Sequence, residues 1–338
     1  MPSSDVALIH HPAGTDEALR RALEDLQLGR WLSTRDLLAA TGLNRSLRTS
    51  RSQVLALYAA RGDSVAAWCA EEPDSGDAAM MRARVLTQRA LDLQAEHPGH
   101  RNVGRAADAA RQACLIARDR QPLDPVPVVC LLALAQLDVD PQYRRYRENW
   151  EPVPDSLVPA GPWKLLDWAN RLDPPYSREA HHRVLQCLHA RGRGALGFAR
   201  WVSRDAQLGS SLLVLPLYAY VEDYRRQRQA ATRYSRGPIG YWTSEAVQHV
   251  ARKARDYWFY PIQQLPPDER PARSLSDLNH LACILVKAGL PGLAGPVFRE
   301  IGPYATVAPW AQVSESAEWQ DRFHRARAFA LSREPARG

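Results

Sequence analysis

The chain has 338 residues, 45% of them hydrophobic and 24% charged, a composition typical of a soluble globular protein and not of a disordered or membrane-embedded one. Its formal net charge of +7 would favour an anionic partner, but lysine occurs only at Lys164, Lys253 and Lys287, and this arginine bias indicates GC-rich codon usage more than a binding surface. The five cysteines are scattered and form no C-x-x-C pair, which excludes zinc-binding and disulfide frameworks and indicates free thiols in a reducing compartment.

Helical periodicity begins near the N-terminus and continues through the first half of the chain. Residues 19–26 place leucines at helical spacing before a glycine, and residues 30–42 predict a second helix that ends at another glycine, which together make an antiparallel hairpin. Residues 51–72 predict a further hairpin with a Gly-Asp turn. Residues 103–117 carry small side chains at helical spacing, which allows two helices to approach closely. The longest apolar run, residues 126–137, predicts a buried helix and is too short to cross a bilayer.

Proline recurs at the start of loops that run into predicted helices. Pro73, Pro122 and Pro174 stand at intervals of about fifty residues, which suggests degenerate helical repeats. No stretch alternates apolar and polar residues between hairpin turns, so we expect no significant strand. We therefore predict an all-α fold of stacked antiparallel helical hairpins, a tetratricopeptide-like α-solenoid with irregular repeats.

A proline-rich segment with little periodicity, residues 139–162, interrupts the helical pattern. We expect an N-terminal helical-hairpin array over residues 1–138, a connecting segment over 139–162, and a C-terminal helical array over 163–338 with an arginine- and aromatic-rich loop. The first residues show no secretory signal, so we expect a cytoplasmic protein without a membrane partner.

Four stretches of the chain carry a resemblance to a known family: LQLGRWLSTRDLLAATG, REAHHRVLQCLHARG, FARWVSRDAQLGSSLLVLPLYAYVEDYRR and DLNHLACILVKAGLPGLAGPVFREIGPYA. They resemble an actinobacterial family of tetratricopeptide-like helical-repeat proteins, and the similarity covers most of the chain. The resemblance implies a helical-repeat fold and implies no activity, because its motifs specify structure and not chemistry.

Two predicted helices place a carboxylate three residues before a histidine, the spacing that puts both side chains on one helix face. Bundles that bind two metal ions use two such pairs and one further carboxylate from each of two other helices. A di-metal carboxylate and histidine oxidase built in this way would use Asp167, Glu179, His182, Glu222, Asp277 and His280. A chain with 37 acidic residues and 10 histidines produces such pairs by chance, and Cys/His zinc spacing is absent, so we favour no metal site and expect no cofactor.

The most distinctive segment, residues 224–242, combines arginines with tyrosines and contains no acidic residue. Arginines at a helix C-terminus are explained by the helix dipole, at about 0.3–1 kcal/mol each, whereas arginines in a loop are free to pair with phosphates or acidic side chains. Tyrosine and tryptophan beside arginine suit either protein recognition or base stacking. The predicted partner-binding surface consists of Arg225, Arg226, Arg228, Arg233, Tyr234, Arg236 and Trp242.

The sequence contains no G-x-S-x-G elbow and no glycine-rich phosphate loop after a strand. Curved helical arrays most often bind peptides or proteins in a concave groove. We therefore predict a non-enzymatic scaffold or regulatory protein with a protein or peptide partner. Two alternatives stay open: a nucleic-acid or nucleotide-binding regulator that uses residues 224–242, and the di-metal oxidase.

Overall fold

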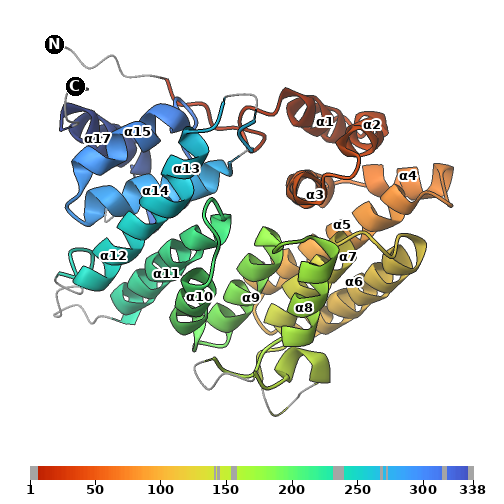
Figure 1. The fold of residues 1–338 in the computed structure, drawn as a ribbon. Helices are drawn as coiled ribbons and strands as arrows, with labels where there is room; N and C mark the ends of the chain where they lie inside the picture. Colours follow the sequence, from red (N-terminus) through yellow and green to blue (C-terminus); the bar gives the residue numbers. More distant parts are fainter. Residues whose placement is uncertain are drawn as a thin grey trace. The chain divides into compact units, whose positions relative to one another are not determined.

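The structure is a computed structural model and describes residues 7–140, 142, 145–153, 158–230, 240–266, 269–271, 273–313 and 318–333. Helices make up most of these residues, and no strand occurs among them beyond an isolated bridge between Glu151 and Gly161. The prediction of an all-α fold is confirmed (Figure 1). The chain divides into two compact units, Thr15–Ala195 (the 15–195 unit) and Leu196–Gly338 together with Met1–Gly14 (the 196–338 unit).

Short connections join most helices of the 15–195 unit. Its helices are α1 (Glu17–Gln27), α2 (Leu32–Thr41), α3 (Arg45–Ala59), α4 (Ser64–Glu71), α5 (Gly76–Glu96), α6 (Arg101–Arg120), α7 (Val126–Leu134), η1 (Ala135–Leu137), η3 (Arg147–Trp150), α8 (Trp163–Leu172) and α9 (Arg178–Ala190). The Asp16 carboxylate starts α1 by accepting a hydrogen bond from the Leu19 amide at 3.0 Å, and Asn44 caps α3 in the same way. Gly29 and Gly42, the predicted helix ends, follow α1 and α2 with positive φ.

The core of the 15–195 unit contains the two helices that the sequence marks most clearly. Ala107 and Ala110 of α6 pack with Ala90 of α5 and Leu134 of α7, so the predicted stripe of small residues does bring helices together. Every residue of α7 is buried, which confirms the predicted buried helix. Small side chains on α6 thus leave room for the large apolar surface of α7.

The division between the two units falls between residues 195 and 196. The segment 139–162, which the sequence predicts to connect two arrays, lies within the 15–195 unit. Its Trp150 is buried and donates through Nε1 to the Asp138 carboxylate at 2.9 Å. The guanidinium of Arg191, from the end of α9, lies 3.7 Å from the centre of the Trp150 ring.

The 196–338 unit is built around α14. Its helices are α10 (Ala195–Arg204), η4 (Ser211–Val214), α11 (Leu215–Ala230), α12 (Glu245–Ala254), the π-helix η5 (Arg255–Phe259), α13 (Tyr260–Gln263), α14 (Leu275–Lys287), α15 (Pro291–Ile301), α16 (Val307–Val313) and α17 (Trp319–Ser332). The α14 helix packs against α12, α15, α16 and α17, and its residues from Asp277 to Leu285 are all buried. Residues 7–14 join this unit, since the Ile9 amide donates to the Pro303 carbonyl at 2.9 Å.

Two sets of side chains hold α16 and α17 against α14. The Asn279 amide group of α14 accepts from Trp310 Nε1 of α16 at 2.9 Å and donates to the Leu275 carbonyl at 2.8 Å. Trp310 also meets Phe323 of α17 edge to face, with ring centres 5.3 Å apart, and Phe298 of α15 completes the aromatic cluster. These contacts fix the three helices that bound the candidate site.

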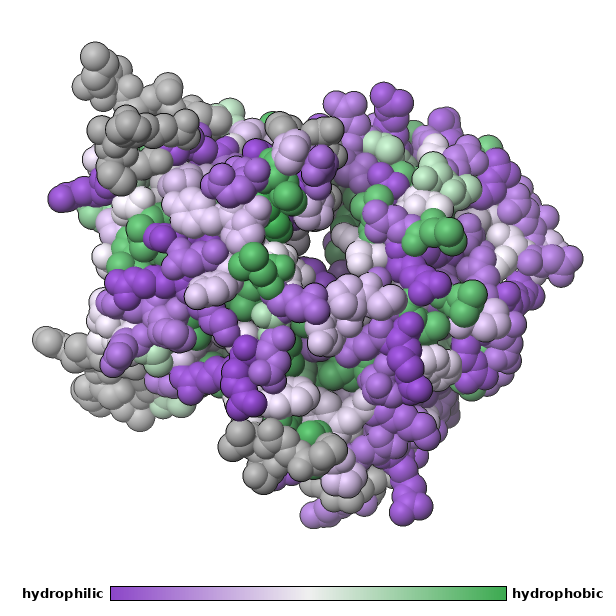
Figure 2. Space-filling model, viewed as in Figure 1, coloured by the Kyte–Doolittle hydropathy of each residue, from purple (hydrophilic) through white to green (hydrophobic). Residues whose placement is uncertain are grey.

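Hydrophilic side chains predominate on the face shown in Figure 2, and the hydrophobic ones form small separate groups. Among the described helices, none combines the length and the apolar character needed to span a bilayer.

Candidate functional site

Glu179, the first of the suggested metal ligands, is committed to two arginines inside the 15–195 unit. Its carboxylate oxygens accept hydrogen bonds from Arg84 Nη1 and Nη2 at 2.7 and 2.6 Å, and from Arg183 Nε and Nη2 at 3.2 and 3.0 Å. Burial disfavours the charged form of Glu179, but the facing guanidinium groups of Arg84 and Arg183 outweigh it and hold its pKa below the usual range. Glu179 is therefore a structural counter-ion for two buried cations.

The remaining suggested ligands also have partners within the protein. Asp167 is exposed and pairs with Arg171 one turn along α8. Asp277 accepts a hydrogen bond from the Tyr218 hydroxyl at 2.6 Å, and the His280 ring stacks on the Tyr218 ring with centres 3.6 Å apart.

His182 is half-buried on α9 in the 15–195 unit, while Glu222, Asp277 and His280 belong to the 196–338 unit. Within the described part of the chain, no three His, Cys, Asp or Glu side chains are grouped so that they could hold a metal ion. The structure thus offers no support for the di-metal alternative.

The predicted arginine surface is divided between the end of α11 and residues that lie outside the described part of the chain. Glu222 of α11 accepts from Arg225 Nε and Nη2 at 2.7 and 2.6 Å and from Arg226 Nε at 3.0 Å, so one carboxylate offsets both cations. Arg228 lies 5.8 Å from the centre of the Tyr224 ring. The residues Arg233, Tyr234 and Arg236 fall in 231–239, which the structure does not describe.

Trp242, the last residue of the predicted surface, is a core residue. Its side chain is 8% exposed and packs against Tyr224 and Tyr241, with ring centres 4.7 and 5.0 Å away. The Tyr241 hydroxyl donates to the Tyr220 carbonyl at 2.9 Å and reaches the Asp223 carboxylate at 2.8 Å, which ties the aromatic group to α11. This cluster closes the core around α11 and leaves little aromatic face for a ligand.

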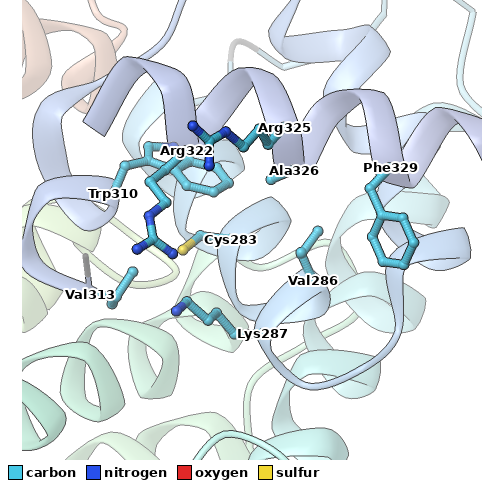
Figure 3. A pocket seen from close by; sticks show the side chains of 9 residues that line it. All are labelled: Cys283, Val286, Lys287, Trp310, Val313, Arg322, Arg325, Ala326 and Phe329. Carbon is cyan, nitrogen blue, oxygen red and sulfur yellow. The ribbon is translucent and has the colours of Figure 1, made fainter. Parts of the chain in front are cut away.

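A different part of the 196–338 unit offers an open site. A pocket of about 440 Å³ lies between α14, α16 and α17 (Figure 3). We call it the α14–α17 pocket, and its lining residues are Cys283, Val286, Lys287, Trp310, Val313, Arg322, Arg325, Ala326 and Phe329. Its volume falls within the range of ligand pockets in proteins.

The walls of the α14–α17 pocket are apolar and fixed. Trp310 is held by Asn279 and by the aromatic cluster, as described above, and is 3% exposed. Phe329, at the opposite end from Val313, is 46% exposed. Burial raises the pKa of the Cys283 thiol to about 12, with Lys287 opposing the shift, so the thiol stays protonated at neutral pH.

Three cations stand around these apolar walls. Arg322 extends from α17 toward Cys283 and Lys287 of α14, so a guanidinium and an ammonium enter the same opening from facing helices (Figure 3). Arg325 has one acidic neighbour, Asp321 at 3.9 Å, and both side chains are more than half exposed, which makes the pair weak. Among the described residues, no carboxylate lines the pocket or pairs with Lys287 or Arg322. This contrasts with Arg225 and Arg226, which share a carboxylate.

The α14–α17 pocket is not evident from the sequence, because its residues come from three helices and face one space only once those helices pack together. A partial signal exists on α17, where Arg322, Arg325, Ala326 and Phe329 recur at helical spacing, so that cations and apolar residues share one helix face. Nothing on that face identifies Lys287 as its neighbour, since this requires the packing of α14 against α17.

Comparison of the chain with models of protein families, with curated proteins and with solved structures finds no match. Fixed apolar walls with cations at the opening suit a ligand that is apolar in part and anionic in part.

Proposed function

We propose that this protein is a non-enzymatic interaction protein that binds an acidic and apolar segment of a partner protein in the α14–α17 pocket. One apolar side chain of the partner enters between Trp310, Val313 and Phe329, and acidic groups beside it pair with the rim cations. The observation that carries the proposal is the combination of an open apolar pocket with cations that no described carboxylate neutralises. We further propose the tetratricopeptide-like arrangement of stacked hairpins as the class of scaffold that presents this pocket.

The energetics favour this division of roles between apolar and charged groups. Burying one large apolar side chain in the pocket contributes about 1.5–3 kcal/mol. The cations add less to the affinity, because Arg322 and Arg325 are exposed and screened by salt, but they accelerate association and disfavour basic partners. A peptide that lacks either feature should therefore bind weakly.

A peptide fits the described surfaces better than a nucleic acid does. Single-stranded nucleic acid needs aromatic faces beside unpaired cations, whereas Tyr224 and Trp242 are buried and Arg225 shares Glu222 with its neighbour. The α14–α17 pocket instead places cations beside an apolar cavity. This arrangement suits a peptide in an extended conformation that inserts one side chain into the cavity.

A titration of labelled peptides by fluorescence anisotropy tests the proposal. The three probes are a short peptide with leucine between glutamates, its counterpart with lysine for glutamate, and its counterpart with serine for leucine. We expect the first peptide to bind more tightly than both others by about tenfold, and its affinity to fall with added salt. Equal affinity for the acidic and the basic peptide would refute the proposal.

Matched variants locate the binding. Arg322→Gln removes a rim cation, and Arg327→Gln removes one from the same helix at a position that does not line the pocket. We expect Arg322→Gln to weaken binding of the acidic peptide about three- to tenfold and Arg327→Gln to leave it within about 1.5-fold. Equal losses in the two variants would show that the peptide responds only to overall charge.

A further inference from the structure

We propose that a second cavity of the 196–338 unit, between α10 and α12, binds a small ligand that carries a phosphate group. The cavity has a volume of about 500 Å³. Its polar lining consists of Arg200, Ser203 and Arg204 of α10 and Glu245, His249 and Lys253 of α12. This site is separate in its residues from the α14–α17 pocket and does not depend on the function proposed above.

The spacing of these residues directs them into one space. Arg200 and Arg204 are four residues apart on α10, and Glu245, His249 and Lys253 follow at intervals of four on α12, so each set occupies one helix face. Ala246 and Val250 complete the lining, and the hydrocarbon parts of the longer side chains add to its apolar surface. The charged ends of the lining side chains are the groups that would hold an anionic ligand.

Two of the cations are oriented by neutral partners. Lys253 Nζ donates to the Ser203 backbone carbonyl at 2.7 Å, and Arg200 Nη2 donates to the Tyr220 hydroxyl. A neutral acceptor fixes the direction of the side chain without offsetting its charge. The ammonium and the guanidinium each keep further N–H donors for a ligand, and their positions are set before it arrives.

The charges of the lining favour a dianion. Arg204 has an acidic neighbour in Asp205 at 3.3 Å, but both side chains are about 70% exposed and the pair is weak. Glu245, the carboxylate of the lining, stands in the first turn of α12, where it complements the helix dipole. With three cations and one carboxylate, the cavity lining carries an excess positive charge that a phosphate dianion would offset. The forked guanidinium groups of Arg200 and Arg204 match phosphate oxygens in geometry.

Calorimetric titration of the full chain with inorganic pyrophosphate tests this proposal, with AMP and ATP as parallel probes. We expect saturable binding of pyrophosphate that weakens as salt is raised, because the contacts are ionic. Similar affinity for all three probes would identify phosphate alone as the recognised group, and much tighter binding of a nucleotide would identify a nucleotide as the source. Absence of saturable binding to every probe would overturn the proposal.

Three single variants locate the phosphate and separate this site from the peptide pocket. Arg200→Gln and Arg204→Gln should each weaken pyrophosphate binding about tenfold. Arg252→Gln removes an exposed cation of α12 that does not line the cavity, and it should leave the affinity unchanged. Equal losses in Arg252→Gln and Arg204→Gln would overturn the proposal. The peptide titration should be unaffected in all three, so either proposal can fail while the other stands.

Discussion

Replacing Glu179 with glutamine removes the carboxylate that Arg84 and Arg183 share inside the 15–195 unit. In the protein, both carboxylate oxygens meet the Arg84 guanidinium at 2.7 and 2.6 Å, and Arg183 approaches one of them at 3.0 Å. Glutamine keeps the shape of the side chain but presents an amide N–H₂ where an acceptor is needed. Two buried guanidinium groups then lack a counter-ion, and a donor faces a donor.

The burial of the pair determines the magnitude of the loss. The side chains of Arg84 and Glu179 are 3% and 6% exposed, so water cannot replace the missing carboxylate. Breaking such a pair by removing one partner costs about 3–5 kcal/mol. Asp167→Asn provides a matched control. Asp167 and Arg171 form an ion pair at the same four-residue spacing as Glu179 and Arg183, but their side chains are 64% and 69% exposed. That change should cost about 0.5 kcal/mol or less.

Urea unfolding of the full chain, followed by far-ultraviolet circular dichroism, measures both variants. With an m-value of about 2 kcal/mol per molar urea, Glu179→Gln should lower the midpoint by about 1.5–2.5 M and Asp167→Asn by less than about 0.3 M. If the two units unfold in separate transitions, only one transition should move. If Glu179→Gln shifted the urea midpoint no more than Asp167→Asn does, the buried ion pair would be refuted as a determinant of stability.

Three further predictions follow from burial in the two units. The pKa of Glu179 is held below its ordinary value of about 4.3, so the stabilising effect of its carboxylate is complete above that pH and is lost as the pH falls through the lowered pKa. Acidification should therefore lower the urea midpoint less in Glu179→Gln than in the unaltered protein. Phe298→Ala removes a fully buried ring of the 196–338 unit and should cost about 3–5 kcal/mol, visible in a thermal scan. Iodoacetamide at neutral pH should modify half-buried Cys69 well before Cys283, whose pKa is about 12, and mass spectrometry showing equal rates would contradict the burial of Cys283.

Features that depend on neighbouring residues could be predicted from the sequence. The ends of α1 and α2 follow from glycines that adopt positive φ, and the burial of α7 follows from its uninterrupted apolar run. The stripe of small residues on α6 likewise identifies the face that meets α5. Each of these signals is local, so a single stretch of sequence contains all the information it needs.

Features that depend on tertiary packing could not be predicted in this way. The spacing of Glu179 and His182 places both on α9, but the presence of Arg84 opposite Glu179 comes from α5, far away in the chain. Burial of Trp242 results from its packing against Tyr224 of α11, which its position in an arginine-rich stretch does not reveal. The α14–α17 pocket forms only where three helices pack together, and no sequence motif predicts that packing.

The central claim is that the α14–α17 pocket binds an acidic and apolar segment of a partner. Hydrogen–deuterium exchange of the full chain, with and without the glutamate–leucine peptide, tests it most directly because it locates the contact. We predict slower exchange in 283–287, 310–313 and 322–329 on peptide addition, and unchanged exchange in α10 and α12. Unchanged exchange in these three segments, or protection confined to α11 around Arg225, would contradict the account.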